Sequence, residues 1–415
     1  MGQDRNKNKK VTAGSNAVTV ILIAAGVLIY AISGGARANF GIIIQPLTDS
    51  SGISYATLSF ILGISQLMYG VTQPLWGMLA LKRSNSVVLL CGIPLMSGGL
   101  LISALTHSSI LMFISLGLMI GSGGGALCFG MIMGAISPVL GPKRAAAASG
   151  ILNAGSGIGG AALSPTIQMI SAGAGISIAL IILAAPFIVL IPIVLWIRKK
   201  EAAAYSETSD ADDSNSEKAS SVSLLKEAVS TADYRRLMAG FSTCGFHMII
   251  TQTHMVPYFT SLGISEARAA IIYTAYGVFT MVGAVVSGLL CTRFHLKNVL
   301  GSLYGARVMA VALFLFASPK NAATILIFAL IMGMTGEATV TPTSEIISRR
   351  FGARAMGFLF GITFVCHQIG AFISSWLGGI FIDNLGNYNL IWMIDIGLCA
   401  LASFVSFRIG THDGE

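Results

Sequence analysis

Long apolar stretches alternate with short polar turns along almost the whole chain. A membrane-crossing helix needs about 20 largely apolar residues, because its backbone polar groups must be satisfied within the helix. Twelve stretches meet this need, and they predict an all-α membrane protein with twelve transmembrane helices. The predicted spans are approximately 17–47, 54–80, 86–106, 109–138, 144–172, 175–197, 236–261, 268–291, 298–317, 321–347, 355–382 and 388–408.

One long polar stretch, at about residues 199–233, interrupts this alternation and is rich in Ser, Ala, Asp and Glu. Its low hydrophobicity is typical of a disordered or partly helical linker. We therefore expect an N-terminal six-helix bundle (1–198), a cytoplasmic linker (199–233) and a C-terminal six-helix bundle (234–415). A docking segment for a regulatory partner is the alternative interpretation of the polar stretch.

A turn motif occurs once in each half of the chain. The segment 77–83, GMLALKR, follows the second span, and the segment 288–294, GLLCTRF, follows the eighth span. The two copies are 288 − 77 = 211 residues apart, and each runs from a glycine into positive charge. A repeated turn among apolar spans predicts two pseudo-symmetric bundles, which is an architecture of secondary transporters.

The composition supports a membrane protein, and the placement of charge predicts its orientation. The apolar set makes up 54% of the residues, charged residues make up only 10%, and the formal net charge is +8. Lys and Arg gather in the N-terminal tail, the even-numbered turns and the C-terminal end, for example at Lys82–Arg83 and Arg349–Arg350. By the positive-inside rule we expect both termini to be cytoplasmic, in a multi-pass protein of the cytoplasmic (inner) membrane. The positive charge is then a topology signal and does not indicate nucleic-acid binding.

The sequence offers no signature of catalysis or of a bound cofactor. The six cysteines lie in or at the ends of spans without ligand spacing, so we interpret them as small packing residues. No nucleophile–base pair, metal-ligand spacing or phosphate-binding loop is apparent. We therefore expect that the protein is not an enzyme and holds neither metal nor cofactor, and we expect no cleavable signal peptide.

Charged residues inside a span are costly and therefore mark candidate sites. Arg37 lies about twenty residues into the first span, on a helical stripe with Tyr30, Gly34 and Gly41. Arginine carries a permanent charge on a planar fork that suits a carboxylate. The pattern predicts a substrate anchor at Arg37. A structural arginine, or one whose head reaches the outer surface, is the alternative.

The seventh span carries a second polar stripe of His247, Thr251, His254 and Tyr258. Adding the repeat distance of 211 to position 37 gives position 248, next to His247. Histidine titrates near neutral pH, so His254 is a candidate for the coupled proton, and both histidines could bind an anion. A buried histidine satisfied by a neighbour is the alternative.

A carboxyl group lies near the middle of the tenth span, at Glu337. In a site of low dielectric constant such a group can take up and release a proton, so Glu337 is the second proton-coupling candidate. An ion pair between Glu337 and Arg307 of the ninth span is the alternative. The remaining substrate-binding candidates are weaker, because hydrogen bonds between helices are their default role. They are Tyr30, Gln66, Tyr69, Asn153, Tyr258 and His367.

More specific motifs support a family resemblance. They are GARANFG at 35–41, QPLWG at 73–77, CGF at 244–246 and HQIG at 367–370. On these residues the chain resembles the major facilitator superfamily, and within it the bacterial monocarboxylate-porter-like members related to the monocarboxylate and oxalate/formate carriers. The chain departs from the superfamily turn motif at Leu81 and Thr292, where an acid is expected. It also lacks, between Ala269 and Cys291 of the eighth span, the cationic residue for which characterised carriers are known.

The resemblance implies that spans one, four, seven and ten line a central cavity. Arg37, His247, His254 and Glu337 would then face that cavity, while Arg307 and Asp395 would lie in peripheral helices. The expected function is alternating-access secondary transport of small monocarboxylate-like organic anions with protons, by a monomer in the lipid bilayer. Proton-driven efflux of a hydrophobic or cationic compound is the first alternative, and a non-transporting sensor or scaffold is the second.

Overall fold

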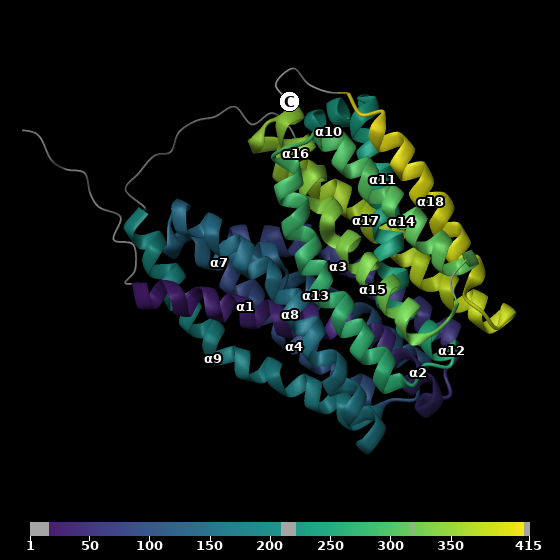
Figure 1. Cartoon of the computed structure of the whole chain (residues 1–415). Helices are drawn as coiled ribbons and strands as arrows, with labels where there is room; N and C mark the ends of the chain where they lie inside the picture. Colours follow the sequence, from purple (N-terminus) through teal and green to yellow (C-terminus); the bar gives the residue numbers. More distant parts are fainter. Residues whose placement is uncertain (1–15, 209–220, 318, 411–415) are drawn as a thin grey trace, which may run out of the picture.

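The computed structural model describes residues 16–208, 221–317 and 319–410, and the regular elements within these ranges are helices (Figure 1). Residues before the linker form six membrane passes. The first pass consists of α1 (Asn16–Ala38) and α2 (Phe40–Ser51), and the fourth of α5 (Ser109–Met112), η1 (Phe113–Ile120), α6 (Gly121–Ala126) and α7 (Phe129–Leu140). The other four are α3 (Tyr55–Lys82), α4 (Asn85–Leu105), α8 (Pro142–Ala174) and α9 (Ile176–Thr208).

The residues after the linker form six more passes, preceded by the short helix α10 (Ser221–Ser230). The seventh pass consists of α11 (Ala232–Ile249), η2 (Ile250–His254) and α12 (Met255–Ser261), and the tenth of α15 (Ala322–Gly336), η4 (Glu337–Thr339) and α16 (Val340–Phe351). The ninth consists of α14 (Leu296–Ala312) and η3 (Leu313–Ala317). The others are α13 (Glu266–Cys291), α17 (Ala353–Leu385) and α18 (Asn389–Phe407). The expectation of twelve helical passes is therefore confirmed.

Length and hydropathy alone identify fewer spans than the fold contains. Within the described ranges, nine helical segments are long and apolar enough to cross a membrane. The other three passes are α3, α8 and the α11–α12 pass, which carry more glycine, serine and polar residues. Such residues let helix backbones approach closely, so these three passes are suited to close packing against other helices.

The internal repeat predicted from one turn motif extends through both halves. Helix α13 begins 266 − 55 = 211 residues after α3, and the same distance separates the first residues of α4 and α14 and those of α8 and α17. The six glycines with positive φ also form pairs 211 apart: Gly52 and Gly263, Gly141 and Gly352, Gly175 and Gly386. The turns need glycine there because other residues rarely adopt this backbone conformation. The repeat therefore appears in the positions of the helices and in the backbone conformation of the turns, as well as in the sequence motif.

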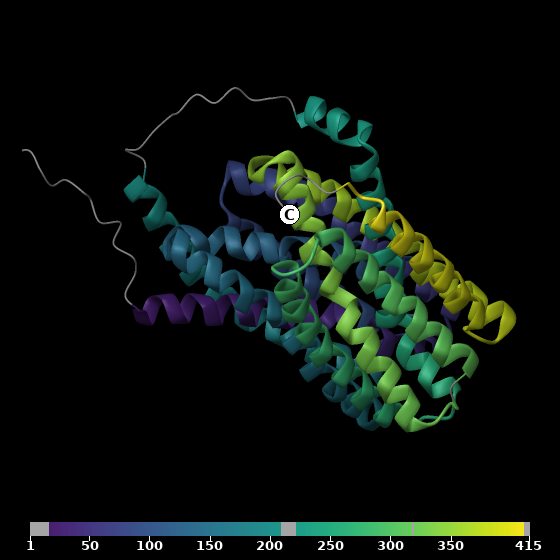
Figure 2. The same ribbon diagram turned by 45° about the horizontal axis from the view of Figure 1, so that its top comes forward.

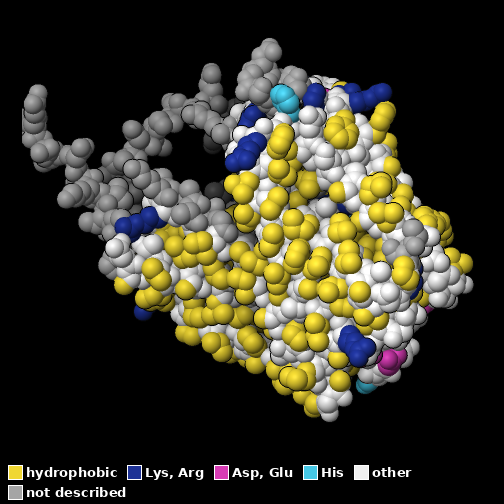
Figure 3. Space-filling view, in the orientation of Figure 1, with side chains coloured by type: hydrophobic (Ala, Val, Ile, Leu, Met, Phe, Trp, Pro, Cys, Tyr) yellow, Lys and Arg dark blue, Asp and Glu magenta, His cyan; other side chains and the backbone are white. Residues whose placement is uncertain are grey.

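The two groups of helices meet at one end and spread apart at the other. In Figures 1 and 2 the purple-to-blue helices and the green-to-yellow helices converge near α2 and α12, and they separate toward α7 and α16. The spread end carries the basic turns, including Lys82, Arg83 and Arg349, and is called the basic end below. Apolar side chains cover most of the face shown in Figure 3, as expected for a surface in contact with lipid.

Hydrogen bonds join the two halves at the end where they meet, which is called the sealed end below. The hydroxyl of Ser164 donates to the carbonyl oxygen of Ala270 (3.0 Å), and the amide of Gln168 donates to Glu266 (2.7 Å). On the other side of the interface, the backbone N–H of Ala56 donates to Asp383 (2.9 Å). The helices that these bonds join are α8 with α13 and α3 with α17.

Helix α9 continues ten residues past the predicted end of the first bundle, to Thr208. Its Glu201 is 1% exposed, and its carboxylate accepts the backbone N–H groups of Asn85 and Ser86, each at 3.1 Å. These are orphan donors at the N-terminus of α4, where a negative charge is favourable. The start of the polar stretch is thus packed onto the first bundle, and the exact limits of the domains stay a prediction.

An ion-pair cluster at the basic end gives a pH-dependent prediction for stability. Burial alone would raise the pKa of the Asp233 carboxyl. Hydrogen bonds from Arg236 (2.6 Å) and from the Gly410 N–H (3.2 Å), together with the positive charges of Arg350 and Arg236, outweigh burial. The net effect is a pKa below the ordinary value. A carboxyl with a lowered folded-state pKa stabilises the fold above its unfolded pKa of about 4, and this stability is lost as the pH falls through the folded value.

Asp233→Asn should therefore lower the free energy of unfolding by about 2 kcal/mol at pH 7, the scale of hydrogen bonds to a charged group. Thermal unfolding of purified protein measures this as a lower Tm, and the difference from wild type should shrink below about pH 4. Glu345→Gln is the control, because this substitution removes the same charge from an ion pair, with Arg349, that is exposed to solvent. Exposed ion pairs contribute little to stability. An equal loss of Tm in both variants would contradict the prediction.

Candidate functional site

The four passes expected to line the cavity are all broken near their middle. The first breaks at Asn39, the fourth at Leu127–Cys128, the seventh in the π-helix η2 and the tenth in the 3-10 helix η4. These breaks obey the repeat, because 39 + 211 = 250 is the first residue of η2 and 127 + 211 = 338 lies in η4. A break inside a membrane helix exposes backbone polar groups and is tolerated where it lines a site.

Arg37 lies in the last turn of α1, directly before the break in the first pass. Its Nη2 donates to Oε1 of Gln66 (2.6 Å), and its guanidinium carbon lies 3.4 Å from the centre of the Tyr69 ring. No carboxylate in the described part of the chain pairs with it. A Cβ added at Gly124 would lie 2.7 Å from Cδ of Arg37, so only glycine leaves room for this side chain. The guanidinium is therefore held in place while its charge stays available.

Glu337 is the first residue of η4, and the structure brings it toward the same region as Arg37. Tyr30 lies within electrostatic range of both Arg37 and Glu337. Across the described ranges, no hydrogen bond or ion pair involves the Glu337 carboxylate. The structure thus gathers four predicted substrate-binding residues, Arg37, Tyr30, Gln66 and Tyr69, and one predicted proton carrier, Glu337.

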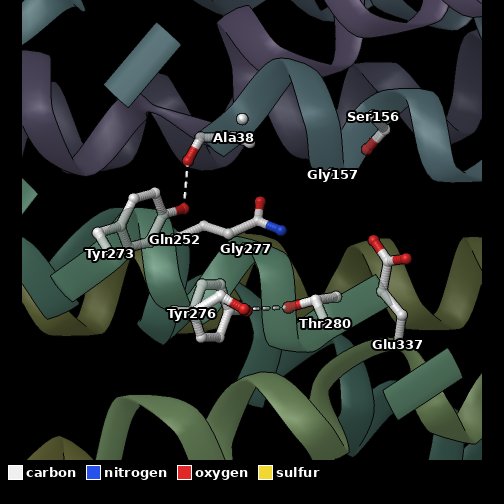
Figure 4. Close-up of a pocket in the computed structure, with 10 residues that line it drawn as sticks. Ala38, Ser156, Gly157, Gln252, Tyr273, Tyr276, Gly277, Thr280 and Glu337 are labelled. Atoms are coloured by element: carbon white, nitrogen blue, oxygen red, sulfur yellow. Dashed lines mark hydrogen bonds between the residues drawn. The ribbon is translucent and has the colours of Figure 1, made fainter. Parts of the chain in front are cut away.

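A cavity of about 40 Å³ lies between α8 and α13, beside Glu337. In Figure 4 the Glu337 carboxylate, the Gln252 amide and the Ser156 hydroxyl point toward one another across it. Both tyrosine hydroxyls on its wall are engaged elsewhere: Tyr273 donates to the carbonyl oxygen of Ala38, and Tyr276 lies 3.0 Å from Thr251 Oγ1. The lining residues are Ala38, Ser156, Gly157, Gly160, Gln252, Tyr273, Tyr276, Gly277, Thr280 and Glu337.

Sequence reasoning missed most of this cavity because it searched the eighth span for positive charge. Tyr273, Tyr276 and Thr280 occur at i, i+3 and i+7, which places them on one helical face. That polar and aromatic stripe was the signal available in the sequence. Gln252 carried no comparable signal, because a lone amide in a span more often bonds a neighbouring helix.

Arg307 does not form the ion pair with Glu337 that was the alternative interpretation of both residues. Its Nη2 donates instead to the carbonyl oxygens of Thr335 (2.5 Å) and Gly336 (2.8 Å), immediately before Glu337. That alternative is wrong in this conformation. The acid is left free because the arginine binds the backbone beside it.

His247 lies inside the second half and away from the cavity. Its Nδ1 is 2.8 Å from Oδ2 of Asp395, and both side chains are 1% exposed. Because a carboxylate accepts, Nδ1 carries the proton. Cys399 completes a group of three possible metal-ligating side chains, although the charge of Arg307 lies within electrostatic range of His247 and Cys399 and disfavours a cation there. The expectation that His247 faces the cavity does not hold in this structure, and its binding role stays a prediction.

His254 is fully buried at the sealed end, where it joins the two halves. Its Nε2 lies 3.0 Å from the carbonyl oxygen of Ser375, and its Nδ1 lies 3.0 Å from the hydroxyl of Tyr55. A carbonyl can only accept, so Nε2 carries the proton and Nδ1 of the neutral ring accepts from Tyr55. Tyr388 in turn donates to Tyr55 (3.2 Å), and Ser375 donates to the carbonyl oxygen of Ser59 (2.8 Å). We call these five residues (Tyr55, Ser59, His254, Ser375 and Tyr388) the Tyr55–His254 belt.

The belt corrects the expectation that His254 faces the cavity, since both of its ring nitrogens are engaged: Nδ1 by Tyr55 of the first half and Nε2 by Ser375 of the second half. Tyr258 also lies at this end, where its ring packs against Tyr388 and Trp392 with centroids 5.6 Å from each. His367 stacks on Phe364 with ring centroids 5.3 Å apart, and its Nδ1 forms no hydrogen bond within the described ranges. The side chain of Asn153 lies outside the described residues. The roles of these residues in substrate or proton binding stay predictions.

Comparisons with known proteins agree with this fold. A family model described as Major Facilitator Superfamily matches residues 26–375 and also 238–413. The chain is 26% identical over 379 residues to Monocarboxylate transporter 12 of Rattus norvegicus, covering 85% of this chain and 76% of that protein. It is 22% identical over 396 residues to the Oxalate:formate antiporter of Oxalobacter formigenes, covering 94% and 90%. A match with the uncharacterized MFS-type transporter YcxA of Bacillus subtilis is 27% identical but covers only 43% of that protein.

Solved structures of similar shape are also transporters. The nucleoside transporter NupG superposes with a TM-score of 0.73 at 14% identity, covering 95% of this chain and all of that chain. The E. coli Fucose:proton symporter FucP superposes with a TM-score of 0.62 at 16% identity, covering 96% and 99%. At such identities the likeness concerns the fold alone, an all-helical structure of many membrane spans.

The Tyr55–His254 belt predicts how firmly the sealed end is closed. Tyr55→Phe removes the hydroxyl that bridges His254 and Tyr388, so two neutral hydrogen bonds of about 1 kcal/mol each are lost. We expect the ratio of open to closed sealed end to rise roughly 30-fold, since 1.4 kcal/mol corresponds to a factor of ten. Electron–electron distance measurements between spin labels at Ser50 and Leu385, in a cysteine-free background, should show a larger population at long distance.

Tyr258→Phe is the matched control, because the hydroxyl of Tyr258 forms no hydrogen bond with any described residue, although its ring lies in the same aromatic cluster. It should leave the distance distribution as in the unsubstituted background. Equal distributions for Tyr55→Phe and Tyr258→Phe would show that the belt does not set the closure.

Proposed function

The chain belongs to the Major Facilitator Superfamily and is a secondary transporter, and we propose that it carries small monocarboxylate-like organic anions together with protons. Transport proceeds by alternating access, in which the two bundles rock about the site between Arg37 and Glu337. The protein acts as a monomer in the cytoplasmic membrane with both termini in the cytoplasm. The basic end is then the cytoplasmic end, and the structure represents a conformation closed toward the outside.

One observation carries the proposal for an anion. Arg37 presents a permanent positive charge at the central break without a carboxylate partner among the described residues, and Gln66 and Tyr69 fix its orientation. A membrane protein retains such a charge at high cost unless a ligand or a cavity compensates for it. A carboxylate can accept the remaining N–H groups of the guanidinium as paired hydrogen bonds. The named activities of the monocarboxylate and oxalate:formate relatives are consistent with this substrate class.

Glu337 couples the movement of the anion to the movement of a proton. Its carboxylate lies beside the cavity without a fixed partner in the described structure, so it can take up a proton without breaking an ion pair. A bound anion neutralises Arg37, and a bound proton neutralises Glu337. Moving the loaded carrier through the bilayer then exposes no net charge in a region of low dielectric constant. This coupling favours simultaneous movement of both ligands.

Substitution of Arg37 tests the anion site. Arg37→Gln removes a charge-assisted contact of about 3 kcal/mol, so affinity for the anion should fall roughly 100-fold. Arg37→Lys keeps the charge but loses the planar fork, and should show a smaller loss. Counterflow of labelled lactate in proteoliposomes measures both variants.

Arg293→Gln is the control for this experiment, because Arg293 is an exposed arginine in a turn at the basic end. Uptake of labelled lactate by Arg37→Gln at the wild-type level would contradict the anion proposal. If the same liposomes instead export a lipophilic cation in a manner that needs Glu337, efflux becomes the function, with the unpaired acid and the tyrosine-lined cavity as its binding site.

Substitution of Glu337 tests the coupling separately from binding. Glu337→Gln resembles the protonated acid, so exchange of labelled lactate at equal pH should continue while accumulation driven by a pH gradient is lost. Glu345→Gln, at an exposed position of the same pass, should retain both activities. Gradient-driven accumulation by Glu337→Gln would assign the proton to another group, of which His254 is the other candidate.

A further inference from the structure

Arg307 is a buried charge that the transport mechanism above does not use. It lies in α14, its side chain is 0% exposed, and it forms no ion pair with any carboxylate of the described residues. Its guanidinium carbon lies 5.1 Å from the centre of the Tyr304 ring. Placing a charge in such surroundings costs several kcal/mol, and a role in the fold alone would be met more cheaply by an apolar side chain.

Arg307 binds two backbone carbonyls at the break of the tenth pass, and its Nη2 also lies 3.6 Å from Sγ of Cys244. Helix α15 ends at Gly336, and the Nη2 of Arg307 donates to Thr335 O and Gly336 O. The last carbonyls of a helix lack partners one turn ahead and carry partial negative charge, which favours a cation. The Gly336 carbonyl belongs to the peptide bond that leads into Glu337. Arg307 therefore fixes the peptide unit from which the acid projects.

Two further helices hold the same turn. The thiol of Cys244 lies 3.0 Å from Thr339 Oγ1 and 3.8 Å from the carbonyl oxygen of Gly336. The hydroxyl of Ser287 donates to the carbonyl oxygen of Ala338 (2.5 Å). The short helix η4 is thus supported from α11, α13 and α14, and only the contact from α14 is charged.

The break in the fourth pass corresponds to the break in the tenth pass through the internal repeat, but it has no acidic residue. Subtracting 211 from 337 and from 307 gives Ala126 and Met96 in the first half. Met96 is fully buried beside Gly123, and the hydroxyl of Ser33, which corresponds to Cys244, donates to the carbonyl oxygen of Leu127. The first half therefore builds the equivalent break with an apolar residue at the place of Arg307. Arg307 is therefore present in the half that has the acid Glu337, and a break of this kind does not by itself require an arginine.

We propose that Arg307 is a positioning residue for Glu337: by binding the Thr335 and Gly336 carbonyls it keeps the carboxylate beside the cavity. This inference rests on the proposed function in one respect, which is that Glu337 carries the transported proton. Arg307 acts through the backbone, and it touches neither the acid nor the cargo.

Other titratable groups surround both residues and set the background for any pH measurement. Tyr30, Tyr276 and Cys244 lie within electrostatic range of Glu337. Cys244, Cys399, Tyr304, His247 and His367 lie within electrostatic range of Arg307. All of them are present in each variant below, so differences between variants report the substituted residue.

The test follows the protonation of Glu337 without requiring a substrate. Dicyclohexylcarbodiimide reacts with protonated carboxyls in apolar surroundings, and mass spectrometry of the peptide containing Glu337 gives the extent of reaction at each pH. The full chain in proteoliposomes is compared with Arg307→Lys and Arg307→Gln, and Glu337→Gln serves as the blank. Arg293→Lys and Arg293→Gln, at the exposed arginine of the basic end, are the matched controls.

The positioning role predicts that both Arg307 variants lower the pH midpoint of labelling by at least about one unit, a tenfold change in the protonation equilibrium. Neither lysine nor glutamine can hold both carbonyls in the arginine geometry, so the released turn lets the carboxylate reach water. A purely electrostatic role gives a different result: the midpoint rises in Arg307→Gln and stays in place in Arg307→Lys. That result, or an unchanged midpoint in both variants, overturns the proposal.

A second measurement covers the case in which single variants fold poorly. Arg307→Met combined with Glu337→Ala recreates the Met96 and Ala126 pair of the first half. Thermal unfolding should show that the double variant recovers at least half of the Tm lost by Arg307→Met alone, because the two residues are coupled. A double variant as unstable as Arg307→Met means that Arg307 serves the fold alone. Neither measurement depends on lactate flux, so failure of the anion proposal at Arg37 would be seen separately.

Discussion

The constraint on which the structure depends is that a helix broken inside a bilayer must find partners for the backbone groups it releases. At the first break, the Asn39 amide donates to the carbonyls of Gly35 and Gly160, and Tyr273 donates to Ala38. At the tenth pass, Arg307, Cys244 and Ser287 perform the same task. Apart from the Asn39–Gly35 bond, which lies within the first pass, these partners come from other helices, so each break also ties helices together. The site exists where it does because that is where breaks can be satisfied.

The two halves use the same scaffold for different chemistry. The repeat aligns Arg37 with Met248, Gln66 with Gly277 and Tyr69 with Thr280, so the cationic anchor belongs to the first half alone. It aligns Glu337 with Ala126, so the acid belongs to the second half alone. A cargo that contacts Arg37 and a proton on Glu337 therefore bind opposite sides of the interface between the bundles. Binding of both ligands can then bias the relative position of the halves, which is the requirement for coupling in alternating access.

The sequence predicted the scaffold better than it predicted the side-chain contacts. Twelve passes and the 211-residue repeat follow from apolar length and one turn motif, which are properties of single segments and of their spacing. The placement of Arg37 beside Gln66 and Tyr69 was within reach, because a charge in a span must face polar groups. The position of His254 was not, because its partners Tyr55 and Ser375 are 199 and 121 residues away. The contact with Tyr55 also depends on how the two bundles meet. Tyr273 and Tyr276 were missed for a different reason, since only charge was sought in the eighth span.

The contacts at the sealed end are of a kind that a transport cycle can break. The Tyr55–His254 belt consists of hydrogen bonds between neutral groups, each contributing about 1 kcal/mol, and its members come from both halves. Three of these bonds cross between the halves, and together they contribute about 3 kcal/mol. That is less than the roughly 5.5 kcal/mol that inverts a two-state equilibrium from 1:99 to 99:1. Strong ion pairs in the same place would exceed what differential binding of a small anion supplies. The two carboxylates that bond across the sealed end, Glu266 and Asp383, accept from an amide and from a backbone N–H. Among the described residues no ion pair between the halves therefore has to be broken there, and the charges that ligands neutralise lie at the central site.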